Sequence, residues 1–179
     1  VYKRQVRDIV NDLKDFARET PSERSDDIDV NKVVEKAVGL VSNLIRKSTD
    51  NFSVKYMTDP PVFKGNAQRI EQVIINLVMN ACQALPDGKK AVRVITGKDP
   101  EGPSVFVDVR DEGTGMPPDI VQQIKDPFFT TKRDGGGTGL GLAISDRIVQ
   151  DHEGKLTFTS EPGSGTTVRV SFPYQQEKI

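Results

Sequence analysis

Four side-chain amides recur at helical spacing in the middle of the chain. Gln72, Asn76, Asn80 and Gln83 are separated by four, four and three residues, so they fall along one edge of a predicted helix. An amide oxygen is a hard, neutral ligand for Mg²⁺, which keeps most of its waters and also binds phosphate oxygens. A solvated helix face is the plainer interpretation. Because the amides border a wide apolar arc of the same helix, we expect them at the rim of a ligand cleft.

Two glycine clusters lie within residues 111–142, one near each end of this segment. The first comprises Gly113 and Gly115, and the second runs from Gly135 to Gly141 and leads into an apolar helical pattern. Glycine is favoured where the backbone takes left-handed angles or approaches another group closely. A glycine-rich turn that opens a helix presents free N–H groups and the positive end of the helix dipole, which suits phosphate. We predict that this block holds a nucleotide beneath a mobile lid.

Asp111 ends a predicted strand directly before the first glycine pair. A carboxylate fixed at this point could accept a hydrogen bond from the exocyclic amine of a base. It would favour adenine, because guanine carries its amine at a different position. An Asp that only caps the turn remains the alternative.

Hydrophobic periodicity places these residues on an α+β framework. Helices are predicted for about residues 31–45, 66–85 and 140–150, and strands for 28–30, 52–57, 91–97, 104–111, 155–160 and 166–172. Asn31 is the predicted cap of the first helix. Helices interleaved with hairpin-joined strands indicate a two-layer α/β sandwich, in which helices cover one face of a mixed, mostly antiparallel sheet.

The first 27 residues are predicted to lie outside this framework. Apolar side chains from Tyr2 to Phe16 follow a heptad pattern for about two heptads, which predicts a helix over residues 1–19. That helix could belong to a coiled coil or bundle, or it could pack on its own domain. Residues 20–27 contain no apolar side chain and are predicted to be a linker. The main domain then spans residues 28–175.

Composition narrows the class of protein. The net charge of −1 gives no support for general nucleic-acid affinity. The single cysteine, Cys82, excludes a disulfide framework and is expected in the core. No apolar run approaches the roughly 20 residues that span a bilayer, and no signal peptide is visible. Because the chain starts at Val1 instead of methionine, we interpret it as a fragment of a longer protein and expect it in the cytoplasm.

Taken together, these blocks resemble the ATP-binding catalytic domain of bacterial two-component sensor histidine kinases, within the gyrase, heat-shock-chaperone, histidine-kinase and mismatch-repair ATPase superfamily. Five blocks follow the order of that family over about residues 28–173. They are residues 72–81 (the N box), 111–116 (the first glycine box), 127–132 (the F box), 137–142 (the second glycine box) and 163–166 (a final glycine turn). The FFTTK sequence and Gln83 resemble the nitrogen-regulation type in particular.

The resemblance implies a Bergerat-type fold, about five strands on three helices, with ATP between the Asn-bearing helix and the lid. It implies that Asn80 binds Mg²⁺, that Asn76 contacts phosphate and that Asp111 binds the adenine amine. Gly113, Gly115 and Met116 would line the base pocket, and Thr166 would lie near the adenine through water. Backbone N–H groups would hold the phosphates at Gly137, Thr138, Gly139, Leu140, Gly141 and Leu142. Lys132 would act with Asn76 in catalysis by supplying positive charge from the lid, and more so because Gln83 stands where many relatives carry Lys.

The resemblance also indicates the reaction. Gyrase-like relatives have a water-activating Glu at the position of Asn76, and an amide cannot take a proton from water. Phosphoryl transfer to a protein side chain, by positioning and charge stabilisation, is therefore favoured over rapid hydrolysis. In this family the acceptor is a histidine on a separate helical hairpin. His152, the only histidine, is predicted to be structural, so the fragment should bind ATP without phosphorylating itself.

The partners follow from the same resemblance. Residues 1–19 would be the end of the dimerisation hairpin, the full-length protein a homodimer, and the fragment a monomer or weak dimer because short helices are marginal alone. The remaining partner would be the receiver domain of a response regulator, in a pathway with no role for nucleic acid. The full-length protein could be membrane-anchored or soluble. Two alternatives stay open: a serine-directed kinase of the same superfamily, and a non-catalytic nucleotide-binding or dimerisation module.

Overall fold

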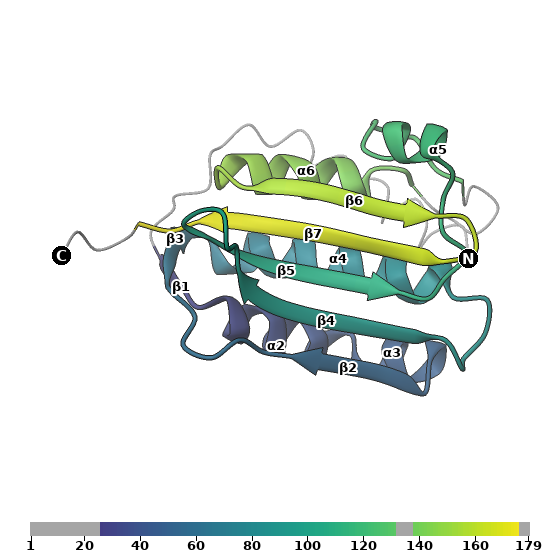
Figure 1. Cartoon of the computed structure of the whole chain (residues 1–179), viewed down its shortest axis with the longest axis horizontal. Coiled ribbons are helices and arrows are strands. Elements are labelled where there is room, and N and C mark those ends of the chain that lie inside the picture. The colour runs from purple at the N-terminus through teal and green to yellow at the C-terminus, as the bar shows by residue number, and fades with distance from the viewer. Residues whose placement is uncertain (1–25, 132–137, 176–179) are drawn as a thin grey trace, which may run out of the picture.

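The computed structural model describes residues 26–131 and 138–175, and within them the chain forms a two-layer α/β sandwich (Figure 1). The strands are β1 (Asp26–Ile28), β2 (Asn51–Lys55), β3 (Phe63–Gly65), β4 (Ala91–Lys98), β5 (Ser104–Asp111), β6 (Lys155–Glu161) and β7 (Gly165–Pro173). The helices are α2 (Val30–Leu40), α3 (Ser42–Ser48), α4 (Ala67–Ala84), α5 (Pro118–Gln123) and α6 (Gly141–Asp151). The predicted helix over residues 1–19 lies outside the described residues.

The main sheet has the strand order β2-β4-β5-β7-β6, and β1 and β3 form a separate two-stranded ribbon. Strand β2 runs parallel to β4, whereas β4, β5, β7 and β6 pair antiparallel. This arrangement confirms the predicted mixed, mostly antiparallel sheet. In Figure 1 helices α2, α3, α4 and α6 lie behind the sheet and α5 lies beyond its β6 edge, so among the described residues one face of the sheet is covered by helices and the other is open.

The core fills the space between the covered sheet face and the helices. Alternate residues of each strand point toward the helices, and in β5 these are Val105, Val107, Val109 and finally Asp111. Helix α4 crosses the middle of this face and packs with α2 on one side and α6 on the other. Its apolar arc is almost fully buried and includes Ile70, Val73, Ile74, Leu77 and Val78. The amide edge of α4 thus has a fixed orientation relative to the sheet.

Side-chain caps define where two of the helices begin. The Asn66 carboxamide oxygen accepts a hydrogen bond from the Arg69 N–H and starts α4, as the sequence predicted. The cap of α2 is Asp29, which accepts from the Asn31 and Lys32 N–H groups, so the predicted cap at Asn31 is wrong. Asn31 lies in the first turn of α2 and bonds instead to Met57 O and to the Thr96 hydroxyl.

The N-terminal part of the domain differs from prediction in two further ways. Strand β1 starts at Asp26, so the last two residues of the predicted linker are in a strand and Val30 is already helical. The single helix predicted for residues 31–45 is two helices, α2 and α3, which meet at Val41. The break follows Gly39, a weak helix former at an exposed position. Breaking here lets Ile45 turn back into the core.

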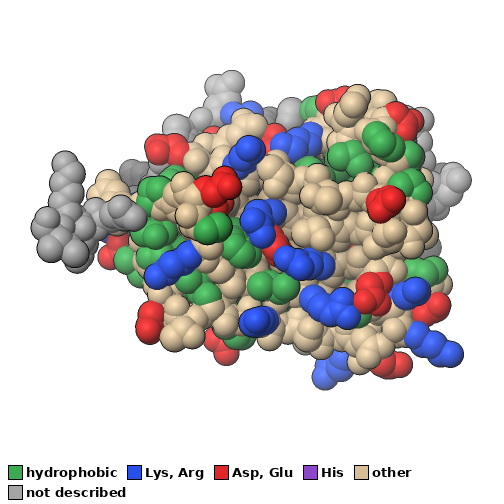
Figure 2. Space-filling model, viewed as in Figure 1, with side chains coloured by type: hydrophobic (Ala, Val, Ile, Leu, Met, Phe, Trp, Pro, Cys, Tyr) green, Lys and Arg blue, Asp and Glu red, His purple; other side chains and the backbone are tan. Residues whose placement is uncertain are grey.

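The open face of the sheet is polar and mainly basic. Figure 2 shows Lys and Arg side chains gathered over the central strands of this face, which include Arg93, Arg110 and Arg169. Asp108 is the buried exception among them, and it is held by two of these arginines. Separately, none of the described helices is both long and apolar enough to cross a membrane.

Candidate functional site

A cavity of about 700 Å³ opens between α4, the loop after β5, the start of α6 and the inner face of β6 and β7. Its volume is in the range of small-molecule sites. The lining combines one row of amides with an apolar wall. The residues that line it are Gln72, Ile75, Asn76, Leu77, Met79, Asn80, Ala81, Gln83, Ala84, Leu85, Asp111, Thr114, Gly115, Met116, Ile120, Ile124, Phe129, Thr130, Thr131, Thr138, Gly139, Gly141, Leu142, Ile144, Ser145, Phe158, Thr166 and Val168.

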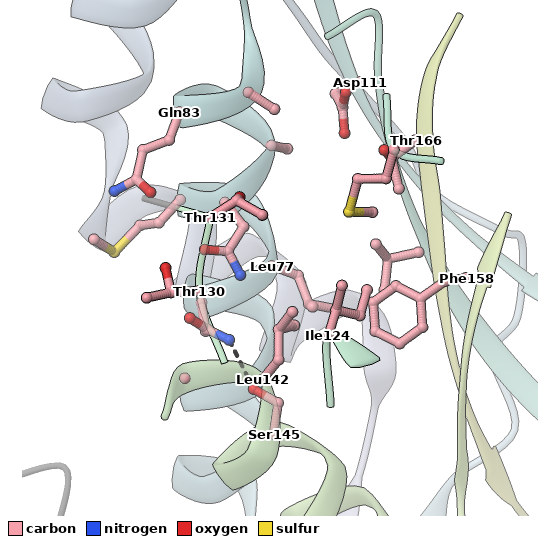
Figure 3. Close-up of a pocket in the computed structure, with 18 of the residues that line it drawn as sticks. Leu77, Gln83, Asp111, Ile124, Thr130, Thr131, Leu142, Ser145, Phe158 and Thr166 are labelled. Atoms are coloured by element: carbon pink, nitrogen blue, oxygen red, sulfur yellow. Dashed lines mark hydrogen bonds between the residues drawn. The ribbon is translucent and has the colours of Figure 1, made fainter. Parts of the chain in front are cut away.

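The four amides predicted from helical spacing all line this cavity. Asn76 is fixed by α6, because its Nδ2 donates a hydrogen bond of 2.9 Å to the Ser145 hydroxyl (Figure 3). A Cβ added at Gly141 would lie 2.6 Å from Asn76 Oδ1, so a larger residue there would displace the Asn76 amide. The carbonyl oxygen of Asn76 therefore has a defined position at the start of α6.

One end of the cavity carries two oxygen-bearing side chains from neighbouring strands. Asp111 of β5 lies directly opposite Thr166 of β7 in the sheet register, and both are 8% exposed. Asp111 Oδ1 accepts a hydrogen bond from the Gly113 N–H at 2.8 Å, which fixes the carboxylate at the strand end. Figure 3 shows Asp111 and Thr166 on the same side of the cavity as Phe158. This end of the cavity thus combines the hydrogen-bond acceptors of Asp111 and Thr166 with the apolar side chain of Phe158.

The opposite side is formed by Thr130, Thr131 and the start of α6 (Figure 3). Helix α6 has Leu140 at its N-cap position and, unlike α2 and α4, has no side-chain cap hydrogen bond; its first turn also contains no acidic residue. Its first N–H groups therefore have no side-chain acceptor at the helix end. Gly139 precedes them with φ of +69°, and its carbonyl accepts from the Phe128 N–H at 2.9 Å. An anion at this helix end would meet donors and the positive end of a dipole.

The two glycines of the first cluster have different roles. Gly115 lines the cavity, and a Cβ there would lie 1.9 Å from the Glu161 carbonyl oxygen at a φ of +66°. Gly113 does not line the cavity. It packs on the end of α4, where a Cβ would lie 2.6 Å from the Ala84 carbonyl oxygen. Gly113 thus supports the loop that carries Gly115 and Met116, and its contact with the base stays a prediction.

Most residues of the second glycine box line the cavity. Thr138, Gly139, Gly141 and Leu142 line the cavity, whereas the side chain of Leu140 is fully buried in the core. Gly137 and Lys132 lie outside the described residues. The roles predicted for these two residues stay predictions.

Several lining residues had no signal in the sequence. Ser145 is a buried serine in the middle of α6, and only the crossing of α6 over α4 brings it to Asn76. Phe158 and Val168 looked like ordinary strand residues. Lys125 does not line the cavity but supports it, because its Nζ bonds Asp146 at 2.9 Å and Leu156 O at 2.8 Å. It thereby ties the segment that follows α5 to α6 and β6.

Acidic side chains are scarce around the amide edge. Among the described residues that line the cavity, Asp111 is the one carboxylate. Glu71 points away from the cavity and forms an ion pair of 2.8 Å with Lys36 of α2. Within the described part of the chain, no three His, Cys, Asp or Glu side chains gather as a metal site. A cation here would depend on amide oxygens and on the ligand itself.

The single histidine and the single cysteine are both structural. His152 is 3% exposed, its Nδ1 bonds Ile148 O at 2.7 Å, and its Nε2 accepts from the Asn66 N–H at 3.0 Å. Burial raises the pKa of the Cys82 thiol; a hydrogen bond to Ser48 lowers it to a smaller extent, and the Asp111 charge raises it slightly. The interpretation of both residues from the sequence is confirmed.

The family model for the histidine kinase-, DNA gyrase B- and HSP90-like ATPases matches residues 65–176, well over half of the chain. The chain belongs to this ATPase family. Within it, the domain is of the ATP-binding catalytic type of sensor histidine kinases, as its relatives show. It is 35% identical over 144 residues to sporulation kinase A of Bacillus subtilis, covering 78% of this chain and 23% of that protein.

The solved structures agree with this assignment. The nucleotide-free catalytic domain of histidine kinase ThkA is 28% identical, with a TM-score of 0.72 over 83% of this chain and 94% of that one. ThkA in complex with response regulator protein TrrA shares the fold at 24% identity, with a TM-score of 0.76 over 99% of this chain and 50% of that one. The domain spans about a quarter of the length of the curated relatives that it matches.

Proposed function

We propose that this domain binds Mg²⁺-ATP in the cavity and transfers the γ-phosphoryl group to a histidine on a separate helical hairpin of the same full-length protein. The observation that carries the proposal is the polarity of the cavity. Acceptors and an apolar wall stand at one end, and amides with an uncapped helix N-terminus stand at the other. A purine nucleotide has the matching polarity, with an amine-bearing base at one end and anionic phosphates at the other.

The adenine would lie at the end formed by Asp111 and Thr166. The carboxylate accepts from the exocyclic amine, directly supporting adenine over a base with a carbonyl at that position. Met116, Phe158 and Ile124 supply apolar surface for the ring. Gly115 lets the loop after β5 pack closely on the end of β6 beside the cavity, because a side chain there would collide with Glu161 O.

The phosphates would lie between α4 and the start of α6. The N–H groups of Gly141 and Leu142 at the start of α6 would donate to the phosphates, and Gly137 and Lys132 would extend the contacts. Asn80 suits Mg²⁺, because its amide oxygen is hard and neutral and the ion obtains its remaining ligands from phosphate and water. When bound, Mg²⁺ would supply positive charge that offsets the negative charge of the phosphates. No carboxylate cluster is needed for such a site.

The lining favours transfer over hydrolysis. A water nucleophile needs a general base, and Asn76 at the amide edge cannot accept its proton. The one carboxylate among the described lining residues, Asp111, belongs to the base end of the cavity. Asn76 instead holds its oxygen at the phosphates through its bond to Ser145. With Lys132 adding charge, the domain would stabilise the transferring group and keep it from water.

The acceptor must be supplied from outside the described fold. His152 is buried and both ring nitrogens are hydrogen-bonded, so it cannot reach the cavity. We assign residues 1–19 to the end of a dimerisation hairpin, residues 20–27 to the linker, and dimerisation to the full-length protein. The phosphohistidine would then serve a receiver domain, as the complex of ThkA with TrrA suggests for its own partner. We expect the domain in the cytoplasm, where ATP is supplied.

The test uses the domain, the histidine-bearing hairpin of its own full-length protein, Mg²⁺ and labelled ATP. Acid-labile phosphate on the hairpin is the expected result, and it should disappear when the hairpin histidine is replaced by Gln. Acid-stable phosphate on serine would instead identify a serine-directed kinase of the same superfamily. Nucleotide binding without any transfer would identify a binding module. Absence of Mg²⁺-ADP binding by the folded domain would refute the proposal as a whole.

A further inference from the structure

A serine behind the cavity is hydrogen-bonded to Thr166, one of the two oxygen-bearing side chains at the Asp111 end. Ser160 of β6 does not line the cavity, but it lies directly opposite Thr166 in the register of β6 and β7. Since Asp111 lies opposite Thr166 on the other side, the three side chains form a row across three strands. All three point to the covered face of the sheet. Thr166 is the middle member and separates Ser160 from the ligand space.

The Ser160 hydroxyl makes three hydrogen-bonding contacts, and the partners differ in whether they can donate, accept or do both. The Met116 N–H can only donate, and it lies 2.9 Å from Ser160 Oγ. The Gly165 carbonyl can only accept, and it lies 3.2 Å away. The Thr166 hydroxyl can do either, and it lies 2.8 Å away. The contacts to Met116 and Gly165 therefore use one lone pair and the only hydrogen of Ser160.

Counting hydrogens fixes the direction of the remaining bond. A serine hydroxyl has one hydrogen and two lone pairs. When its hydrogen goes to Gly165 O, the contact with Thr166 is a hydrogen bond only if Thr166 donates. This is the one assignment that satisfies all three contacts at once. Thr166 then has its hydrogen turned toward β6, and only its lone pairs are left for a ligand in the cavity.

We propose that Ser160 is a positioning residue for nucleotide specificity, which holds the Thr166 hydroxyl as an obligate acceptor for the exocyclic amine of the base. The inference rests on the proposed binding of ATP. With Asp111 a carboxylate, the base end presents two acceptors side by side. An amine with two N–H groups matches both, directly or through water, whereas an oxygen at the same position would face acceptors only.

The bond to the Met116 N–H has a second effect that the test must separate. Loss of the Ser160 hydroxyl would also loosen the loop after β5, and this would weaken every nucleotide by the same factor. Discrimination between two nucleotides cancels that factor. The informative quantity is therefore the ratio of dissociation constants for two ligands that differ only at the amine position.

The experiment compares Ser160→Ala with the wild-type domain by calorimetry in Mg²⁺. The ligands are ADP and 6-methoxypurine riboside diphosphate, which keeps the ring nitrogens of ADP and has an ether oxygen in place of the amine. In the variant, Thr166 is free to donate to that oxygen. The preference for ADP should fall roughly 3- to 10-fold, the worth of one hydrogen bond. Thr159→Ala, on the open face of the same strand, should leave the preference unchanged.

The outcomes separate this inference from the proposed function. A wild-type domain that binds neither diphosphate would remove the proposed function and this inference with it. Binding of ADP by both proteins with the same preference in Ser160→Ala would overturn the inference alone. If Ser160→Ala does not fold, Ser160→Cys decides, because a thiol fills the site but is a weak hydrogen-bonding group. Ser160→Thr, which keeps the hydroxyl, should restore the wild-type preference.

Discussion

Replacing Asp108 by Asn tests the electrostatics of the open sheet face. The Asp108 side chain is fully covered, because Arg169 binds both of its oxygens at 2.6 and 2.9 Å and Arg110 binds one at 2.8 Å. Arg169 is also fixed, since its guanidinium lies 3.9 Å from the centre of the Phe106 ring. That ring in turn lies over Gly97, where a Cβ would be 2.4 Å from it. Asp108→Asn keeps the shape of this cluster and removes its negative charge.

The size of the effect follows from the contacts. Breaking a fully buried ion pair costs about 3–5 kcal/mol, because a charge is left without water or partner. Here the two arginine side chains are 37% and 47% exposed, so each can recover part of its hydration. We therefore expect about 2–3 kcal/mol of lost stability for Asp108→Asn. In a domain of this size that lowers the Tm by roughly 5–10 °C.

The pH dependence gives the same prediction a second readout. Burial alone would raise the pKa of Asp108, but hydrogen bonds from Arg169 and Arg110 and the attraction of both charges outweigh it and hold the pKa below its ordinary 3.8. A depressed pKa in the folded state adds stability that is present above the ordinary pKa. This stability is lost as the pH falls through the folded-state pKa. The stability difference between wild type and Asp108→Asn should thus shrink below about pH 4.

Urea unfolding at pH 7 and at several values down to pH 3 measures both readouts. Glu101→Gln is the matched control, because it removes one exposed negative charge in the turn before β5 and should change stability by less than about 0.5 kcal/mol. The Kd for ADP should be equal in wild type and Asp108→Asn, since the cluster lies on the face opposite the cavity. A loss of stability below 0.5 kcal/mol at pH 7 (about the level of an ordinary surface substitution), or one that does not depend on pH, would refute the reasoning.

Three further predictions concern the cavity. Ser145→Ala removes the hydrogen bond that holds the Asn76 amide and should weaken Mg²⁺-ADP binding by up to about tenfold, the worth of one hydrogen bond. Ser171→Ala on the open face is the control, and equal calorimetric affinities of wild type and Ser145→Ala would contradict the role of Ser145. Lys125→Met removes the bonds from the segment after α5 to Asp146 and Leu156 O, so it should lower both the Tm and the ADP affinity. In a double-mutant cycle with Asp146→Asn the coupling energy should be about 0.5–1.5 kcal/mol, and purely additive effects would contradict the prediction. Lys132→Ala should reduce phosphoryl transfer more than ADP binding, whereas equal losses in both assays would exclude its catalytic role.

Those features that rest on local periodicity could be predicted from the sequence. The amide edge of α4 was found because residues 72, 76, 80 and 83 obey helical spacing on their own, and all four line the cavity. The bounds of β5 were predicted to the residue, because apolar and polar residues alternate until Asp111. These signals need no knowledge of which elements meet.

What the sequence could not provide depends on contacts between distant segments. Gly113 and Gly115 look equivalent in the sequence, yet one packs on the Ala84 carbonyl and the other lines the cavity. Ser145 has the spacing of any polar helix residue until α6 crosses α4. Asn31 is the predicted cap of α2 because Asn is a good capping residue. In the structure Asp29 caps the helix two residues earlier, and the Asn31 side chain bonds to Met57 O and the Thr96 hydroxyl.

The two hydrogen bonds between α4 and the α6 region have a consequence for inhibitors. Asn76 bonds to Ser145, and the Asn66 N–H bonds to His152 just past α6. The two helices are thus joined near the middle of α4 and again where α4 begins, and moving them apart would break both bonds. An inhibitor extended toward the wall formed by α4 and α6 must therefore fit the present spacing of these helices.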